Sequence, residues 1–181
     1  MGQLHLRITQ RNGQWYCAEV VSERTFGYGT YRFYLASRVD QIDQNAVLGL
    51  FTWDNEPVDY NNREIDIEFS RWGSPTNDNV QFVVQPYYHS DNIYRFTIQL
   101  NGDYSTHSFD WRSDRISFQS AHDHYADPPD THIIETWNYT GQDIPPPGNE
   151  NARINLWLFN GLPPSDWQEV EVIVAKFEFI P

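Results

Sequence analysis

Apolar and polar residues alternate in short runs along the whole chain, and turn residues separate the runs. No long segment shows the roughly 3.6-residue period of an amphipathic helix, whereas alternation with period two is typical of strands. Asn12-Gly13 predicts a tight hairpin turn, because both residues accept positive φ. The pattern predicts strands at residues 4–9, 15–22, 30–36, 46–53, 64–70, 80–88, 94–100, 105–111, 115–119, 133–137, 154–159 and 170–180.

About a dozen strands without helices indicate an all-β fold, an antiparallel β-sandwich of the jelly-roll type. At 181 residues the chain fits a single domain covering residues 1–181, and it shows neither an internal repeat nor a linker. This length is ample for a hydrophobic core. A curved antiparallel sheet of this kind offers a concave face to an extended chain ligand.

One strand combines this pattern with candidate chemistry, the run Glu64-Ile65-Asp66-Ile67-Glu68-Phe69. Successive side chains of a strand point to opposite faces, so the three acids share one face and the apolar residues the other. Three like charges on one face repel one another, so folding alone does not favour them. Two carboxylates held across a sugar ring are what hydrolysis of a glycosidic bond needs. Acidic strands also occur on solvent faces, so the run alone leaves both interpretations open.

Composition narrows the class of partner. The net charge of −13 and the pI near 4.6 argue against nucleic acid and against an anionic membrane surface, which both require Lys and Arg. A neutral polymer is compatible with this charge, whereas an anionic polysaccharide is disfavoured unless Arg residues gather at the site. Aromatic residues reach 16% and suit stacking against ligands as well as core packing. The candidate stacking residues are Trp53, Trp72, Tyr87, Tyr88, Trp137 and Trp157.

Several other residues are candidates for simpler roles. The single cysteine excludes an internal disulfide, and its apolar surroundings predict that Cys17 is a small buried core residue. We expect Arg63 to be a solvated charge on the face opposite Glu64. His122 and His124, with His132 nearby, have superficial metal-ligand spacing, but without supporting Cys residues we favour a polar loop and predict no metal site.

No apolar run reaches membrane-spanning length, and Met1-Gly2 leads into a strand-like segment with no visible signal peptide. The chain is therefore either cytoplasmic or a mature domain without its export signal. Asn138-Tyr139-Thr140 fits a glycosylation sequon, which carries little weight without evidence of eukaryotic secretion.

Several segments in the same order resemble glycoside hydrolase family sixteen, endo-β-glucanases with a concanavalin A-like jelly roll. The acidic run matches the family's E-x-D-x-E signature, and residues 26–33 resemble its YG-x-[YF] bend and following strand. Residues 48–53 resemble the strand that precedes the signature. Residues 106–111 resemble its D-W strand, with His107 in place of the usual Tyr, and residues 154–157 match its late N-L-W strand.

The resemblance implies a retaining endo-acting hydrolase in which Glu64 is the nucleophile, Glu68 the acid/base, and Asp66 a hydrogen-bonding assistant. One residue separates Asp66 from Glu68, as in lichenase-type and xyloglucan-active members, which favours β-1,3-1,4-glucan. Trp157 falls in the matched late strand, and Trp53 and Trp72 flank the signature. The implied partner is a polysaccharide bound by a monomer, and a polymer substrate suggests a secreted or periplasmic protein.

Three departures from the family pattern bear on these expectations. The segment before the second or third family strand is missing or shortened, and residues 118–124 replace the usual Y-V-D-G hairpin. No cofactor is required, and Ala175 stands where many members place a calcium-ligating Asp, which argues against the structural calcium. A non-catalytic lectin-like domain or a transglycosylase on the same fold remain alternatives, because fold alone does not confer activity.

Overall fold

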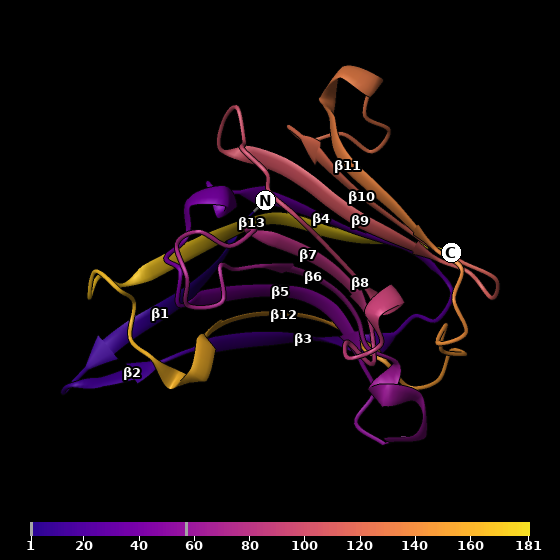
Figure 1. Ribbon diagram of the computed structural model, residues 1–181, viewed down its shortest axis with the longest axis horizontal. Coiled ribbons are helices and arrows are strands. Elements are labelled where there is room, and N and C mark those ends of the chain that lie inside the picture. Colours follow the sequence, from indigo (N-terminus) through magenta and orange to yellow (C-terminus); the bar gives the residue numbers. More distant parts are fainter. Residues whose placement is uncertain (1, 57) are drawn as a thin grey trace.

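The strands form two antiparallel sheets that stack face to face (Figure 1). The computed structural model describes residues 2–56 and 58–181. One sheet has seven strands in the order β11-β10-β9-β4-β13-β1-β2, and the other has six in the order β3-β12-β5-β6-β7-β8. Strands of the six-stranded sheet arch across the molecule, so the face turned away from its partner sheet is concave (Figure 1). The predicted all-β jelly-roll sandwich is confirmed.

The strands are β1 (Leu4–Arg11), β2 (Gln14–Tyr16), β3 (Ala18–Thr25), β4 (Gly29–Ala36), β5 (Ala46–Trp53), β6 (Ile65–Phe69), β7 (Val80–Val84), β8 (Ile93–Phe96), β9 (Tyr104–Trp111), β10 (Ile116–His122), β11 (Ile133–Tyr139), β12 (Asn151–Leu158) and β13 (Val170–Ile180). Short 3-10 helices lie between them, η1 (Val39–Gln41), η2 (Val58–Arg63), η3 (Ser90–Asn92), η4 (Asp130–His132) and η5 (Phe159–Gly161). No helix in residues 2–56 and 58–181 has the length and hydropathy needed to cross a membrane.

The core lies between the two sheets and is built from the inward-facing half of each alternating strand. Phe82 of β7 stacks on Phe118 of β10 with ring centroids 4.9 Å apart, which joins one sheet to the other. Ile65 and Ile67 of β6 are fully buried in this core. The apolar face of the acidic run is therefore fixed in place, and its acidic face is left on the concave side.

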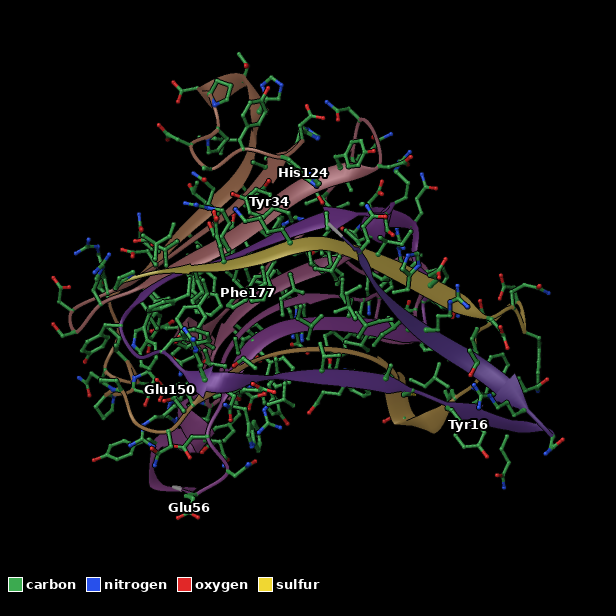
Figure 2. All side chains as sticks on the ribbon, turned by 180° about the vertical axis from the view of Figure 1, so that it is seen from behind. Tyr16, Tyr34, Glu56, His124, Glu150 and Phe177 are labelled. Carbon is green, nitrogen blue, oxygen red and sulfur yellow. The ribbon has the colours of Figure 1, made fainter. Side chains whose placement is uncertain are left out.

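The segment predicted as one strand at residues 15–22 is two strands in different sheets. The chain leaves β2, at the edge of the seven-stranded sheet, and enters β3, at the edge of the other. Cys17 lies at this crossover and is exposed, so the prediction of a buried cysteine is wrong. Figure 2 shows the preceding residue, Tyr16, at the extended end of the sandwich. Hydrophobic neighbours in sequence did not bury Cys17, because both flanking strands are edge strands.

Two other predicted strands are shorter in the structure. The strand predicted at residues 80–88 ends at Val84, and the one at 94–100 is reduced to Ile93–Phe96. The remaining strands agree with the sequence pattern to within about four residues at either end. The predicted hairpin at Asn12-Gly13 is confirmed, with φ of 53° and 80° at the two turn residues.

His107 lies in the core directly behind the acidic strand. Its ring is fully buried, meets the ring of Phe69 edge-on at 4.7 Å, and lies within hydrogen-bond distance of the Ser105 and Ser120 hydroxyls at 2.9 and 2.8 Å. Burial, with a smaller contribution from nearby His122, lowers the pKa of His107 from 6.5 to about 3. The folded protein therefore holds His107 neutral in mildly acidic solution.

We expect His107 to make the fold acid-sensitive. Below pH 6.5 the unfolded chain takes up a proton at this ring and the folded chain does not, so stability falls by at most about 1.4 kcal/mol per pH unit down to pH 3. His107→Gln keeps hydrogen-bonding groups but has no titrating ring, so its free energy of unfolding should lack the part of the pH dependence that is due to His107. Urea unfolding of both proteins at pH 7.5 and 4.5 measures the difference. Equal pH dependence in the two proteins would contradict the expectation.

Candidate active site

The acidic strand β6 lies near the middle of the six-stranded sheet, between β5 and β7. Asp66 is opposite Phe51 and Val83, and Glu68 is opposite Gly49 and Gln81, without a bulge in either pairing. The regular register confirms the unbulged spacing inferred from the sequence. Glu64 itself comes just before the strand, at the end of η2, where the Glu64 carbonyl accepts a hydrogen bond from the Gln85 N–H at 3.2 Å.

The three acids face the same hollow on the concave side. Asp66 is 3% exposed, whereas Glu64 and Glu68 are half-buried. Gln85 donates from Nε2 to Asp66 Oδ2 at 3.2 Å, and Gln81 donates from Nε2 to Glu68 Oε2 at 2.6 Å. Each carboxyl that β6 presents to the hollow therefore has an amide partner from the neighbouring strand or its end.

Burial dominates the ionisation of all three carboxyls. Burial and the charge of Glu68 raise the pKa of Glu64 to about 7, against smaller lowering effects of Asp66 and Arg153. Burial also raises the pKa of Glu68 to about 7, opposed by the Gln81 hydrogen bond and the Arg95 charge. Burial, followed by the charges of Glu64 and Glu68, raises the pKa of Asp66 well above its usual value. Near neutral pH the group as a whole is partly protonated.

Two adjoining hollows of about 350 and 360 Å³ share Glu68 and Trp157. The first contains the acids together with Glu19, Gly49, Phe51, Trp53, Arg153 and Asn155. The second is more apolar and contains Trp72, Gln81, Gln85, Tyr87, Ile93, Arg95 and Phe159. Together they form a groove that passes Glu68.

Four of the aromatic residues singled out in the sequence lie in this groove. Trp157 contacts both hollows, Trp53 lies in the first, and Trp72 and Tyr87 lie in the second. Trp72 meets Trp157 edge-on at 6.4 Å, so the two form one aromatic wall. Tyr87, at 63% exposure, stands at the rim.

Two aromatic candidates lie elsewhere. Trp137 is in β11 of the other sheet, where it stacks on Phe118 at 5.2 Å and packs against the core. Tyr88 is 72% exposed and does not line either hollow. Trp137 therefore contributes to packing and not to the groove. The sequence could not separate the two uses of an aromatic ring, because both sheets alternate in the same way.

Sequence reasoning assigned no site role to the polar residues of the neighbouring strands. Arg153 donates to Glu19 Oε1 at 3.1 Å and to Asn55 Oδ1 at 2.9 Å, and its guanidinium lies 6.0 Å from the Trp53 ring centre. Gly49 leaves room for the Asn155 amide, since a Cβ there would lie 2.6 Å from Asn155 Oδ1. The available signal was alternation: Arg153, Asn155 and Trp157 are every second residue of β12 and share a face.

The histidines do not form a joint site. His124 donates from Nε2 to the Leu35 carbonyl at 2.7 Å, and His132 Nε2 lies 3.4 Å from Asp123 Oδ2. In the described part of the chain no cluster of three or more His, Cys, Asp or Glu side chains is placed to hold a metal ion. Ala175, between the bulged positions Val174 and Lys176 of β13, offers no side-chain oxygen for calcium.

Several solved structures share this fold. Solved structures of β-glucanases superpose on nearly the entire chain, and one of them is an endo-glucanase of glycoside hydrolase family 16 from Bacteroides ovatus (TM-score 0.62, 13% identity, covering 98% of this chain and 80% of that one). No protein-family model and no curated protein sequence matches.

Among the individual structures, a β-glucanase of Bacillus licheniformis has a TM-score of 0.68 and 21% identity, covering 99% of this chain and 79% of its own. A laminarinase from Flavobacterium sp. UMI-01 has a TM-score of 0.70 at 16% identity, with 99% and 79% coverage. A lichenase derived from a mouse hindgut metagenome has a TM-score of 0.63 at 19% identity, with 99% and 80% coverage. At these identities the likeness establishes the fold.

Proposed function

We propose that residues 1–181 form a single catalytic domain that hydrolyses a β-linked glucan by an endo-acting, retaining mechanism. The observation that carries this proposal is the set of three carboxyls of raised pKa on the floor of an aromatic groove. Burying three acids together destabilises a fold, so a purely structural origin does not account for them. A lectin has no need of all three.

In the proposed reaction Glu64 attacks the anomeric carbon while Glu68 protonates the departing glycosidic oxygen. Asp66 donates its hydrogen bond to Glu64, which favours the ionised form of Glu64 as a nucleophile. Burial raises the pKa of Glu68 to about 7, so a substantial fraction of Glu68 carries the proton that a general acid needs near neutral pH. In the second step Glu68 takes a proton from a water molecule. The water oxygen attacks the anomeric carbon, and the bond between that carbon and Glu64 breaks.

Trp53, Trp72, Tyr87 and Trp157 are the proposed stacking surfaces for the sugar rings on the two sides of Glu68. The lichenase among the similar structures is a β-1,3-1,4-glucanase, and the laminarinase shares the fold. Together with the unbulged β6, this favours β-1,3-1,4-glucan as the substrate of this chain. Such a polymer lies outside the cell, so we propose a secreted or periplasmic location and a monomeric enzyme.

A polysaccharide panel tests the function directly. We expect the protein to release reducing ends from mixed-linkage β-glucan faster than from β-1,3-glucan, xyloglucan or cellulose. Size-exclusion chromatography should show early shortening of the polymer, as endo cleavage requires, and NMR should detect the β-anomer of the product first. Binding without cleavage would instead support the lectin alternative. Products longer than the starting oligosaccharide would support a transglycosylase.

A further inference from the structure

One row of side chains crosses three neighbouring strands on the concave face. Glu68 of β6 is directly opposite Gln81 of β7, and Gln81 is directly opposite Arg95 of β8. Side chains opposite one another on adjacent strands are near enough to interact. Arg95 Nε donates to Gln81 Oε1 at 2.9 Å, and Gln81 Nε2 donates to Glu68 Oε2 at 2.6 Å. The row is therefore a continuous hydrogen-bonded chain that ends on the proposed general acid.

The chemistry of arginine fixes the direction of this chain. A guanidinium has donors only, so the group of Gln81 that faces Arg95 must be the carbonyl oxygen. The amide NH2 is then turned to Glu68, and Glu68 Oε2 must accept. Without Arg95, either end of the amide could face the carboxyl. The carbonyl oxygen of a protonated carboxyl is its better acceptor, so a hydrogen bond from Gln81 to Oε2 favours the acid proton of Glu68 on Oε1.

We propose that Arg95 is a positioning residue that acts through Gln81 to orient the Glu68 carboxyl and to place its transferable proton on Oε1. This inference rests on the proposed function. When Glu68 releases its proton to the glycosidic oxygen, the resulting carboxylate keeps the Gln81 N–H bond and gains the favourable field of the Arg95 charge. When Glu68 later takes a proton from water, the same amide leaves Oε1 free to receive it.

The other charges that face Glu68 do not substitute for Arg95. Glu64 and Asp66 lie on its own segment and carry no positive charge that could favour ionisation of Glu68. The row on the opposite side continues through uncharged Gly49 and Asn155 to the distant Glu19. Arg153 is paired with Glu19, whereas Arg95 forms no ion pair with any residue in 2–56 or 58–181. The uncompensated charge that favours the ionised form of Glu68 is thus Arg95.

A competing role for Arg95 is direct binding of substrate, because the guanidinium borders the apolar hollow. The two roles predict different kinetics. If Arg95 binds the sugar directly, Arg95→Met should raise KM on every substrate that fills the hollow. A positioning role lowers kcat only where protonation of the leaving group matters, and it changes the titration of Glu68.

The test is a pH titration of the glutamate side-chain carboxyl carbons by NMR in the whole protein without substrate. Arg95→Met and Gln81→Met should each raise the midpoint of Glu68 by roughly 0.5–1 pH unit, less than a direct ion-pair partner would. Arg95→Lys keeps a donor and the charge, so it should restore most of the shift. Arg11→Met removes an arginine of β1 in the other sheet that forms no ion pair within the described residues, so it is the charge-matched control and should leave the midpoint unchanged.

Kinetics complete the test. Arg95→Met should lose roughly three- to tenfold in kcat on the polysaccharide, but little on an aryl β-glucoside oligosaccharide whose leaving group needs no proton. An unchanged Glu68 midpoint would overturn the proposal, and so would a rise in KM alone. The titration does not require turnover, so it tests the coupling of Arg95 to Glu68 independently of activity. A wild-type protein that cleaves no glucan would overturn the proposed function and leave the titration result standing.

Discussion

Glu68→Gln should abolish hydrolysis of the polysaccharide and at the same time raise the melting temperature. Loss of the general acid lowers kcat by on the order of 10³-fold, within the range that positioned acids contribute. The same variant should still form the glycosyl-enzyme from an activated aryl glycoside, because a good leaving group departs without a proton. Added azide should then restore turnover. Glu64→Gln, which removes the nucleophile, should lose on the order of 10⁵-fold on both substrates and show no such rescue.

The stability gain follows from the sign of the pKa shift. Folding raises the pKa of Glu68 from 4.5 to about 7 through burial. An acid of raised pKa binds its proton more tightly in the folded state than in the unfolded state. The free energy of unfolding therefore falls as the pH rises from 4.5 to 7, and above pH 7 the buried charge of Glu68 opposes folding. Gln carries no charge, so Glu68→Gln should melt several degrees higher than the wild type at pH 8. At pH 4.5 the two proteins should melt at similar temperatures.

A second consequence concerns the partner carboxyl. The charge of Glu68 helps to raise the pKa of Glu64, so Glu68→Gln should lower the pKa of Glu64 and move the acidic limb of aryl-glycoside cleavage downward. Glu23→Gln, an exposed carboxyl on β3, is the control and should change neither activity nor the melting temperature at pH 8. Full activity in Glu68→Gln, or a lower melting temperature at pH 8, would contradict the assignment.

The sequence predicted the fold and the acidic floor of the groove because both depend on alternation. A strand whose apolar half is Ile65, Ile67 and Phe69 can be placed only with that half in the core, and the acids must then face outward. Residues 46–53 are an apolar run, and the structure buries them at nearly every position as β5, in the interior of the six-stranded sheet. These features are local in sequence and need no knowledge of which strands are neighbours.

What the sequence did not predict depends on strand pairing. Gln81 and Arg95 become partners of Glu68 only through the register of β6, β7 and β8. Trp137 and Trp157 both lie in strands with alternating apolar and polar residues. Strand pairing places Trp137 in the seven-stranded sheet against the core and Trp157 in the groove. Cys17 is exposed because the chain changes sheets there, which is a property of topology and not of composition.

Arg63 forms a buried ion pair in the turn that precedes Glu64, the proposed nucleophile. The prediction of a solvated charge is wrong, because Arg63 is 9% exposed. Its Nη1 donates to Asp54 Oδ2 and its Nε to the Pro146 carbonyl, both at 2.8 Å, and Glu150 Oε2 lies 4.0 Å from Nε. Figure 2 shows Glu150 at the end of the sandwich from which the loop with Glu56 projects.

The backbone of the turn that contains Arg63 is strained, and the Arg63–Asp54 ion pair stabilises it. Asn61, Asn62 and Arg63 have φ values of 48°, 56° and 52°, three successive residues in the left-handed region just before Glu64. Asn tolerates this region, whereas Arg does so at a cost of about 1–3 kcal/mol. Burial opposes the ionisation of Asp54, but backbone N–H groups and Arg63 outweigh it and lower its pKa. The strained turn that aims Glu64 is therefore stabilised by a buried charge pair.

We expect Arg63→Met to destabilise the protein by about 3–5 kcal/mol, because it leaves Asp54 and Glu150 buried without their cation. Arg63→Lys should recover little, since a single ammonium cannot reach both Asp54 and the Pro146 carbonyl in the same geometry. Urea unfolding measures both effects. Arg112→Met, which breaks the partly exposed pair with Asp110, is the matched control and should change stability by less than about 1 kcal/mol.

The same substitution separates anchoring of the turn from general stability. With the turn released, Glu64 loses its fixed approach to the anomeric carbon, so Arg63→Met should lower kcat roughly tenfold at a temperature where the variant is still folded. Circular dichroism at the assay temperature establishes that condition. A destabilisation no larger than that of Arg112→Met would mean that the pair does not hold the turn. A large destabilisation with unchanged kcat would mean that the turn holds the fold but does not aim Glu64.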